Sequence, residues 1–268
     1  MYSILEHYLS TNHILMIGMI VTFILTFFLL EHPFSFLPSD QGRAFAVNGS
    51  LSKGKLRGVG FIFVLCFLIS SVLFLPIDVE YVIYAILLFA MMISGYLDDA
   101  SKTPWNEYKK GLIDLVISVV AVLTYMNFNS TTICFGADEI VIPKALLLIL
   151  GVILIWESVN VTNCTDGVDG LCASLCSVTL LAFGVLFAPI LQKYAMANFL
   201  FLSVLFAYLY FNSSPSSMLM GDAGSRALGF YIAVIALKST HPFIYILLAA
   251  VMIVDGGIGL VKIALKRF

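Results

Sequence analysis

Long apolar stretches, separated by short polar segments, run along most of the chain. Nine can be distinguished, and most approach the roughly 20 residues that a helix needs to cross a bilayer. Their bounds are 13–31, 58–76, 81–97, 111–127, 144–160, 169–190, 194–212, 224–239 and 242–265. The eighth is short, and Asp255-Gly256-Gly257 interrupts the ninth. The pattern predicts an all-α integral membrane protein, a polytopic helical bundle with about nine spans.

The composition supports this prediction and excludes several classes of protein. Of the 268 residues, 61% are hydrophobic and 11% are charged, whereas roughly 25% are charged in an ordinary soluble domain. This excludes a soluble globular enzyme, a disordered chain and a nucleic-acid-binding protein. A β-barrel is disfavoured because the apolar residues run continuously and do not alternate. The net charge of −2 says nothing about partners.

Basic residues gather on one side of the predicted bundle. Successive connections between the predicted spans lie alternately on the two sides of the membrane. On this assignment one side holds eleven lysines and arginines, and the other holds three: Lys144, Lys193 and Lys238. Cytoplasmic loops carry the excess of Lys and Arg, so the richer side is predicted to be cytoplasmic and the N-terminus to be outside. The outer acids, such as Asp78 and Glu80, are scattered. The cytoplasmic acids, which favour a cytoplasm-facing active site over a pore, are Asp98, Asp99, Asp166, Asp169 and Asp222.

The first motif is a pair of adjacent carboxylates, Asp98 and Asp99, at the end of a predicted helix. Neighbours on a helix point about 100° apart, so the two are not expected to share one role. One can meet a metal ion while the other meets a second group, and Lys102, Lys109 and Lys110 supply counter-charge for phosphate oxygens. The alternative is an ordinary solvated helix end.

The second motif lies between two very apolar helices and contains Asn163, Asp166 and Asp169. The two aspartates are three residues apart, which places them on one face if the next helix has begun. Nearby glycines allow a ligand close to the backbone. The alternative is that Thr165 or Asp166 caps the following helix, although a cap explains only one of these polar residues.

The third motif runs from Asn212 to Ser225 and places Asp222 between two glycines at a helix start. Asp222 offers hard oxygen ligands for a divalent cation, and the alternative is a cap formed by Asp222 or Ser225. Together the three loops predict a metal–phosphate site, and ligands that are all oxygens favour Mg²⁺ or Mn²⁺. Buried polar contacts between helices are expected for Asp114, Glu157 and Asp255, with a proton or ion relay as the alternative.

The residues resemble a known family. LDDASK (97–102), NCTDGVDGL (163–171) and MGDAGS (220–225) are similar, in sequence and order, to motifs of the polyprenyl-phosphate N-acetylhexosamine-1-phosphate transferases. Three further stretches favour the phospho-N-acetylmuramoyl-pentapeptide transferase branch: LPSDQGR (37–43), SKGK (52–55) and KKGL (109–112). The resemblance covers roughly residues 37 to 268.

The resemblance implies an all-helical enzyme with a cytoplasmic active site in the bacterial plasma (inner) membrane. Such enzymes transfer a sugar 1-phosphate from a UDP-sugar to undecaprenyl phosphate, releasing UMP, with Mg²⁺ as cofactor. In this branch the donor is UDP-N-acetylmuramoyl-pentapeptide, and the product is lipid I for peptidoglycan synthesis. The implied partners are therefore these two substrates and membrane lipids, with a homodimer as a further expectation and no nucleic acid.

The family's functional residues carry over by motif. Asp98 and Asp99 would engage the lipid phosphate and the metal centre, and Asp222 would be a catalytic magnesium ligand together with Asp98. The nucleotide-sugar and phosphate contacts would come from Asn163, Asp166, Asp169, Asn212, Lys53 and Lys102.

Two departures from the family pattern stand out. The family's Gly-Thr-Pro-Thr-Met-Gly-Gly stretch reads GKLRGVG (54–60) here, so no threonine role is expected. The chain also ends at Phe268, so the expectation is a single transmembrane catalytic domain, 1–268, without the family's histidine loop and last helix. The alternatives are a transferase of N-acetylglucosamine 1-phosphate and, from another class, a nucleotide-sugar or cation transporter.

Overall fold

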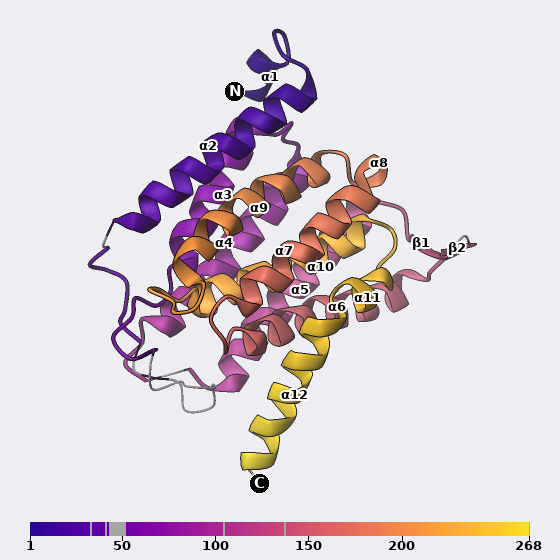
Figure 1. Cartoon of the computed structure of the whole chain (residues 1–268). Coiled ribbons are helices and arrows are strands. Elements are labelled where there is room, and N and C mark those ends of the chain that lie inside the picture. The colour runs from indigo at the N-terminus through magenta and orange to yellow at the C-terminus, as the bar shows by residue number, and fades with distance from the viewer. Residues whose placement is uncertain (33, 41, 43–51, 104, 137, 268) are drawn as a thin grey trace.

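The chain folds into a bundle of helices with one small hairpin (Figure 1). The structure is a computed structural model that describes all residues except 33, 41, 43–51, 104, 137 and 268. The helices are α1 (Tyr2–Leu5), α2 (Thr11–Glu31), α3 (Gly60–Phe74), α4 (Val79–Asp99), α5 (Glu107–Phe128), α6 (Lys144–Thr165), α7 (Leu171–Leu186), α8 (Ala188–Leu191), α9 (Lys193–Asn212), α10 (Gly221–Lys238), α11 (Ile244–Leu248) and α12 (Ala250–Arg267). Strands β1 (Thr132–Phe135) and β2 (Asp138–Val141) pair antiparallel.

Polar caps set the starts of several long helices. Ser10 accepts a hydrogen bond from the His13 N–H at the start of α2. The Asp78 carboxylate accepts one from the Tyr81 N–H (2.9 Å) at the start of α4, and Asn106 accepts one from the Lys109 N–H (2.8 Å) at the start of α5. Such side chains satisfy N–H groups that have no partner within the helix.

Each predicted apolar stretch contains a helix, but the break in the ninth lies elsewhere than predicted. The chain bends at Ala249, between α11 and α12, and α12 runs straight through residues 255–257. Gly256 faces the α6 backbone so closely that a Cβ would overlap Val161. The glycine there allows two helices to approach each other and does not end one.

This is a polytopic helical membrane protein. Five helices, α2, α4, α5, α6 and α9, are long and apolar enough to cross a bilayer by length and composition. Helices α3 and α7 are apolar but have only 15 and 16 residues. The count of nine spans, like the assignment of the whole chain to one catalytic domain, stays a prediction.

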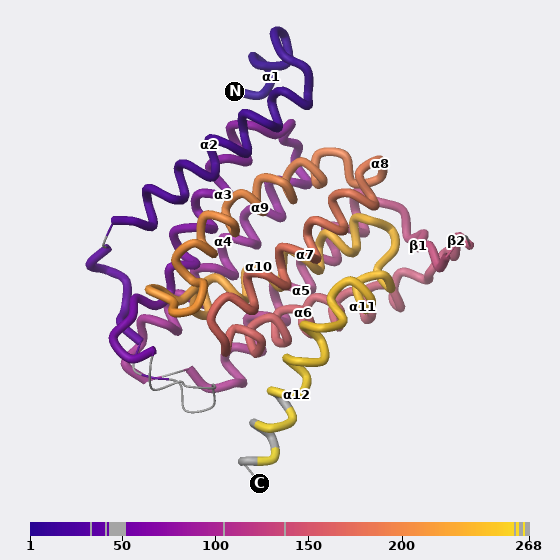
Figure 2. The backbone as a smooth tube through the Cα atoms, in the orientation of Figure 1, coloured from indigo at the N-terminus to yellow at the C-terminus, as the bar shows by residue number. Residues whose placement is uncertain are grey.

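Helix α10 lies at the centre of the bundle (Figure 2). Every residue from Gly221 to Leu237 is buried, and α10 packs against α3, α4, α5, α6 and α7. Two glycines allow this contact: a Cβ on Gly95 of α4 would overlap the Asp222 backbone, and one on Gly229 would overlap α6. The central helix carries the third motif at its start, so the motif is held by packing on several sides. In contrast, α12 packs on α6 near its start, and its C-terminal end extends beyond the bundle.

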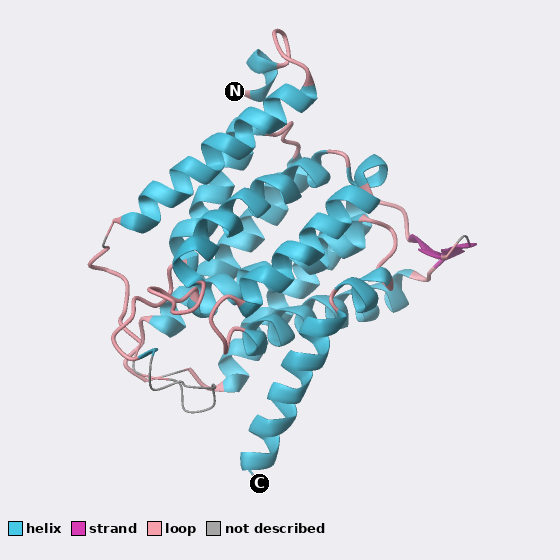
Figure 3. Cartoon of the chain, in the orientation of Figure 1, coloured by secondary structure: helices cyan, strands magenta, loops and turns pink. Residues whose placement is uncertain are grey.

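The end of the bundle away from the acidic motifs is also charged. Glu80, at the start of α4, contacts Lys238 Nζ (2.9 and 3.0 Å) and the Asn129 amide (2.7 Å). Asp78 pairs with Lys193. Two of the outer acids therefore pair with lysines that lie far away in the sequence, because the helix ends meet there. The β1–β2 hairpin projects beyond the bundle (Figure 3).

Candidate active site

Backbone hydrogen bonds join the segment before α3 to the segment that leads into α10, and a glycine turn lies in each. Gly58 and Gly221 have φ values of +76° and +67°, which other residues rarely adopt. The Leu219 N–H donates to the Leu56 carbonyl (2.8 Å), and the Gly60 N–H donates to the Met220 carbonyl (3.0 Å). These bonds place residue 57 directly beside the start of α10.

Asp99 caps α10 from another helix. Its Oδ1 and Oδ2 accept hydrogen bonds from the N–H groups of Asp222 and Ala223, both at 3.1 Å. A carboxylate at a helix N-terminus also interacts favourably with the helix dipole. The predicted caps, Asp222 and Ser225, do not form: α10 has no side-chain cap of its own, and the Ser225 hydroxyl donates to the Gly221 carbonyl.

Asp98 faces a different set of partners, as the angle between helical neighbours predicts. Its Oδ1 accepts from the Trp105 N–H (2.7 Å), and its Oδ2 lies 2.5 Å from Lys110 Nζ. Lys110 Nζ also lies 2.9 Å from Asp222 Oδ2. The first and third motifs therefore meet, and the α5 lysine connects their carboxylates.

Arg57 is the centre of a second set of contacts. Its guanidinium lies 2.8 Å from Asp99 Oδ1, 3.3 Å from Asp222 Oδ1 and 3.5 Å from Asp40 Oδ1. Burial acts to lower the pKa of Arg57, but the neighbouring carboxylates, including Asp166, outweigh it and the pKa is raised. Arg57 is thus fixed as a cation among acids.

The sequence motifs did not reveal Arg57, whereas Lys110 had been expected to supply positive charge beside the first motif. Arg57 falls in the stretch that departs from the family pattern, and its partners become visible only once two loops meet. The departure itself was the available signal, because it puts a charged residue beside two glycines. Of LPSDQGR (37–43), residues 41 and 43 lie outside the described part of the chain.

The acidic cluster fits a magnesium ion. Mg²⁺ in proteins is commonly held by one or two carboxylates together with water and substrate phosphates. Asp98 Oδ2 and Asp222 Oδ2 meet this requirement, since both already contact one cation, the Lys110 ammonium. Among the described residues there is no group of three or more His, Cys, Asp or Glu side chains that could hold a metal ion.

The second motif lies beside this cluster, in the connection from α6 to α7. The Asn163 amide donates to Ser225 Oγ (2.9 Å), which links the motif to α10. Asp169 Oδ2 accepts from the Ser216 N–H (3.0 Å) and lies 3.7 Å from Lys55 Nζ.

The prediction that Asp166 and Asp169 share one helix face is wrong. Helix α6 ends at Thr165 and α7 begins at Leu171, so both aspartates lie between helices. The capping alternative does not hold either. Gly170 precedes α7 without a side-chain cap, and the Thr165 hydroxyl donates to the Val161 carbonyl within α6.

The other predicted substrate residues lie further from the two cations. Asn212 is buried and fastens two loops: its Oδ1 accepts from the Gly170 N–H (3.0 Å), and its Nδ2 donates to the Met218 carbonyl (2.9 Å). Lys53 and Lys102 are exposed, and the structure does not bring them into the ion-pair cluster of Arg57 and Lys110. Their roles stay predictions.

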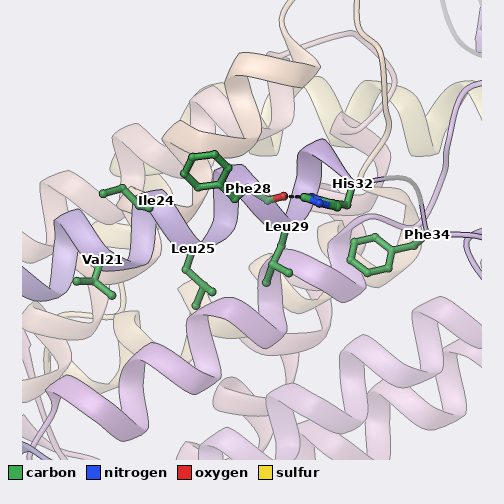
Figure 4. Close-up of a pocket in the computed structure, with 7 residues that line it drawn as sticks. All are labelled: Val21, Ile24, Leu25, Phe28, Leu29, His32 and Phe34. Carbon is green, nitrogen blue, oxygen red and sulfur yellow. Dashed lines mark hydrogen bonds between the residues drawn. The ribbon is translucent and has the colours of Figure 1, made fainter.

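An apolar groove of about 580 Å³ lies along the second half of α2 (Figure 4). At its end the His32 ring contacts the Phe28 carbonyl (2.7 Å). The described residues that line the groove include no acid. Its lining residues are Val21, Ile24, Leu25, Phe28, Leu29, His32 and Phe34.

Comparison with known proteins agrees with a helical membrane protein. The family model described as "Glycosyl transferase family 4" matches residues 81–240, which include both Asp98 and Asp222. The chain belongs to this family of membrane transferases, which confirms the resemblance found in the motifs.

Individual relatives carry a more specific name. A phospho-N-acetylmuramoyl-pentapeptide-transferase of Treponema pallidum (strain Nichols) is 35% identical over 274 residues, covering 94% of this chain and 76% of the relative. The protein of that name from Halalkalibacterium halodurans is 27% identical, covering 91% and 81%. That from Wolinella succinogenes is 29% identical, covering 79% and 68%.

Proposed function

We propose that this chain transfers phospho-N-acetylmuramoyl-pentapeptide from its UDP donor to undecaprenyl phosphate, giving lipid I and UMP. The observation that carries this proposal is the meeting of Asp98, Asp99 and Asp222 with Arg57 and Lys110 at one end of the bundle. Carboxylates for a metal and cations for phosphate oxygens are the parts that phosphoryl transfer needs. The relatives' names supply the substrate.

The side chains suggest a division of labour. Asp98 and Asp222 would hold Mg²⁺, and the ion, when bound, supplies charge neutralisation on the donor diphosphate. Lys110 and Arg57 add positive charge beside it. Asp99 acts as a positioning residue, because its oxygens are taken up by two N–H groups and Arg57. Asn163, Asp166 and Asp169 lie where the rest of the donor could be bound.

The reaction requires no protein nucleophile. The second ionisation of a phosphate monoester lies near pH 6, so the acceptor phosphate is an oxyanion at neutral pH. Its oxygen would bond to the donor phosphorus that carries the sugar, while the bond from that phosphorus to the UMP oxygen breaks. The carboxylate of Asp99, which is unexposed and engaged by two N–H groups and Arg57, supports this single displacement over a covalent aspartyl intermediate on Asp99.

The proposed location follows from the charges. The connections that carry the acids would face the cytoplasm of a bacterium, where UDP-sugars are made, and the N-terminus would lie outside. The homodimer stays a prediction. Mn²⁺ is expected to replace Mg²⁺ in part, because both prefer oxygen ligands.

A two-donor assay tests the substrate. The full chain, in detergent with undecaprenyl phosphate and Mg²⁺, would receive UDP-N-acetylmuramoyl-pentapeptide or UDP-N-acetylglucosamine, with lipid product and UMP both measured. We expect transfer from the first donor and none without the lipid acceptor. Transfer only from the second donor would support the alternative transferase. Uptake of a UDP-sugar into vesicles without UMP release would support a transporter.

A further inference from the structure

Lys110 connects two carboxylates that come from different helices. Its Nζ lies 2.5 Å from Asp98 Oδ2 and 2.9 Å from Asp222 Oδ2. The other oxygen of each carboxylate is engaged elsewhere, Asp98 Oδ1 by the Trp105 N–H and Asp222 Oδ1 by Arg57. The two Oδ2 atoms thus face one ammonium, while the remaining contacts fix the direction in which they point.

The position of the ammonium suits a divalent cation equally well. Carboxylate oxygens are preferred ligands of Mg²⁺ and Mn²⁺, and a charge of +2 interacts more strongly with two carboxylates than a charge of +1. Both cations cannot contact the same two Oδ2 atoms at close range. Binding of a divalent ion therefore requires the ammonium to move.

Lys110 is also freer to move than the two carboxylates that it connects. Its side chain is 21% exposed, compared with 3% for Asp98 and 10% for Asp222. It stands in the first turn of α5, whose start is fixed by the Asn106 cap. A lysine has a flexible four-carbon stem, so its ammonium can swing away without any shift of the helix.

We propose that Lys110 is a place-holder in the cation site: it keeps Asp98 and Asp222 together in the absence of a divalent ion and is displaced when one binds. This inference rests on the proposed function and adds a residue and an exchange step to that site. The released ammonium remains tethered beside the ion, among the groups that would face the donor phosphates.

The first test measures cation binding without turnover. Mn²⁺ would be titrated into the full chain in detergent and the free ion followed by electron paramagnetic resonance. We expect Lys110→Met to bind Mn²⁺ at least about tenfold more tightly, because the competing charge is gone. Lys109→Met is the matched control: it removes the neighbouring positive charge, which lies over the Trp105 ring at 3.2 Å, and should change affinity far less.

The second test follows Lys110 in the unmodified protein. Reductive methylation of lysine amines, read by mass spectrometry, would be compared with and without saturating Mg²⁺. Lys110 should be labelled severalfold faster with the ion, and Lys109, its neighbour on the same peptide, should not change.

Either of two results would overturn the exchange. In the first, Lys110→Met does not bind Mn²⁺ more tightly than the unmodified protein, or Lys109→Met gains affinity to the same extent. In the second, the unmodified protein binds Mn²⁺ but the rate at which Lys110 is methylated does not change. If exchange occurs but the two-donor assay gives no transfer, the proposed function fails while the place-holder role of Lys110 stands.

Discussion

At the scale of single residues, adjacent aspartates have separate tasks. Asp99 caps α10 and contacts Arg57, whereas Asp98 contacts Lys110. Removing a helix cap typically costs about 1 kcal/mol. Asp99→Ala should therefore lower the melting temperature in detergent more than Asp98→Ala does, while both variants lose transfer. A greater loss of stability in Asp98→Ala would contradict the capping role.

Arg57 should not tolerate a lysine. A guanidinium can contact Asp40, Asp99 and Asp222 together because it is planar and has five donors, whereas an ammonium is a compact point charge. We expect Arg57→Lys to fold and to lose about 10- to 100-fold in kcat, because Asp222 would no longer be held in place. Arg57→Met should lose more, since it leaves three carboxylates without their cation. Full activity in Arg57→Met would show that the cluster does not need the guanidinium.

At the scale of helices, the sequence predicted the position of each helix along the chain better than it predicted the packing of helices against one another. Apolar runs located each long helix because burial in lipid or protein selects the same residues. The bend at Ala249 and the connection holding Asp166 and Asp169 depend on packing between helices, which a linear pattern does not record. For the same reason, the three acidic motifs were visible in the sequence and the placement of Arg57 was not.

The expected buried polar contact is confirmed for Asp114, whose partner is Arg226, but it is wrong for Asp255, which is exposed, and Glu157 is only half-buried. The pair lies between α5 and α10 at 2.5 Å, and both side chains are at most 3% exposed. Asp114 stands one turn beyond Lys110, and Arg226 stands one turn beyond Asp222. The Asp114–Arg226 pair therefore connects α5 to α10 one helical turn further along than the Lys110–Asp222 contact does.

Breaking this pair on one side should be costly. Leaving one buried charge unpaired typically costs about 3–5 kcal/mol, whereas replacing both partners by apolar residues is often neutral. Asp114→Leu and Arg226→Met should each lower the melting temperature strongly, and the double variant should recover most of the loss. Additive losses in the double variant would show that the two residues do not stabilise the protein as a pair.

At the scale of the whole molecule, the orientation can be measured directly. Cys134 and Cys164 are the half-buried cysteines, and the other three are buried, so replacing these two by serine gives a suitable background. A cysteine at the exposed Thr103 should then react only with a reagent that reaches the cytoplasm. One at the exposed Asp138, in the hairpin, should react from outside intact cells. The reverse pattern would invert the predicted topology.

The central claim is that a cation site built on Asp222 performs transfer to undecaprenyl phosphate. The most direct measurement is UMP and lipid I release from UDP-N-acetylmuramoyl-pentapeptide by the full chain, compared with Asp222→Asn and with chelation of Mg²⁺. We expect equal amounts of both products from the unmodified protein, none after chelation, and none from an Asp222→Asn variant that retains its melting behaviour. Undiminished release from that variant, or none from the folded unmodified protein, would contradict the account.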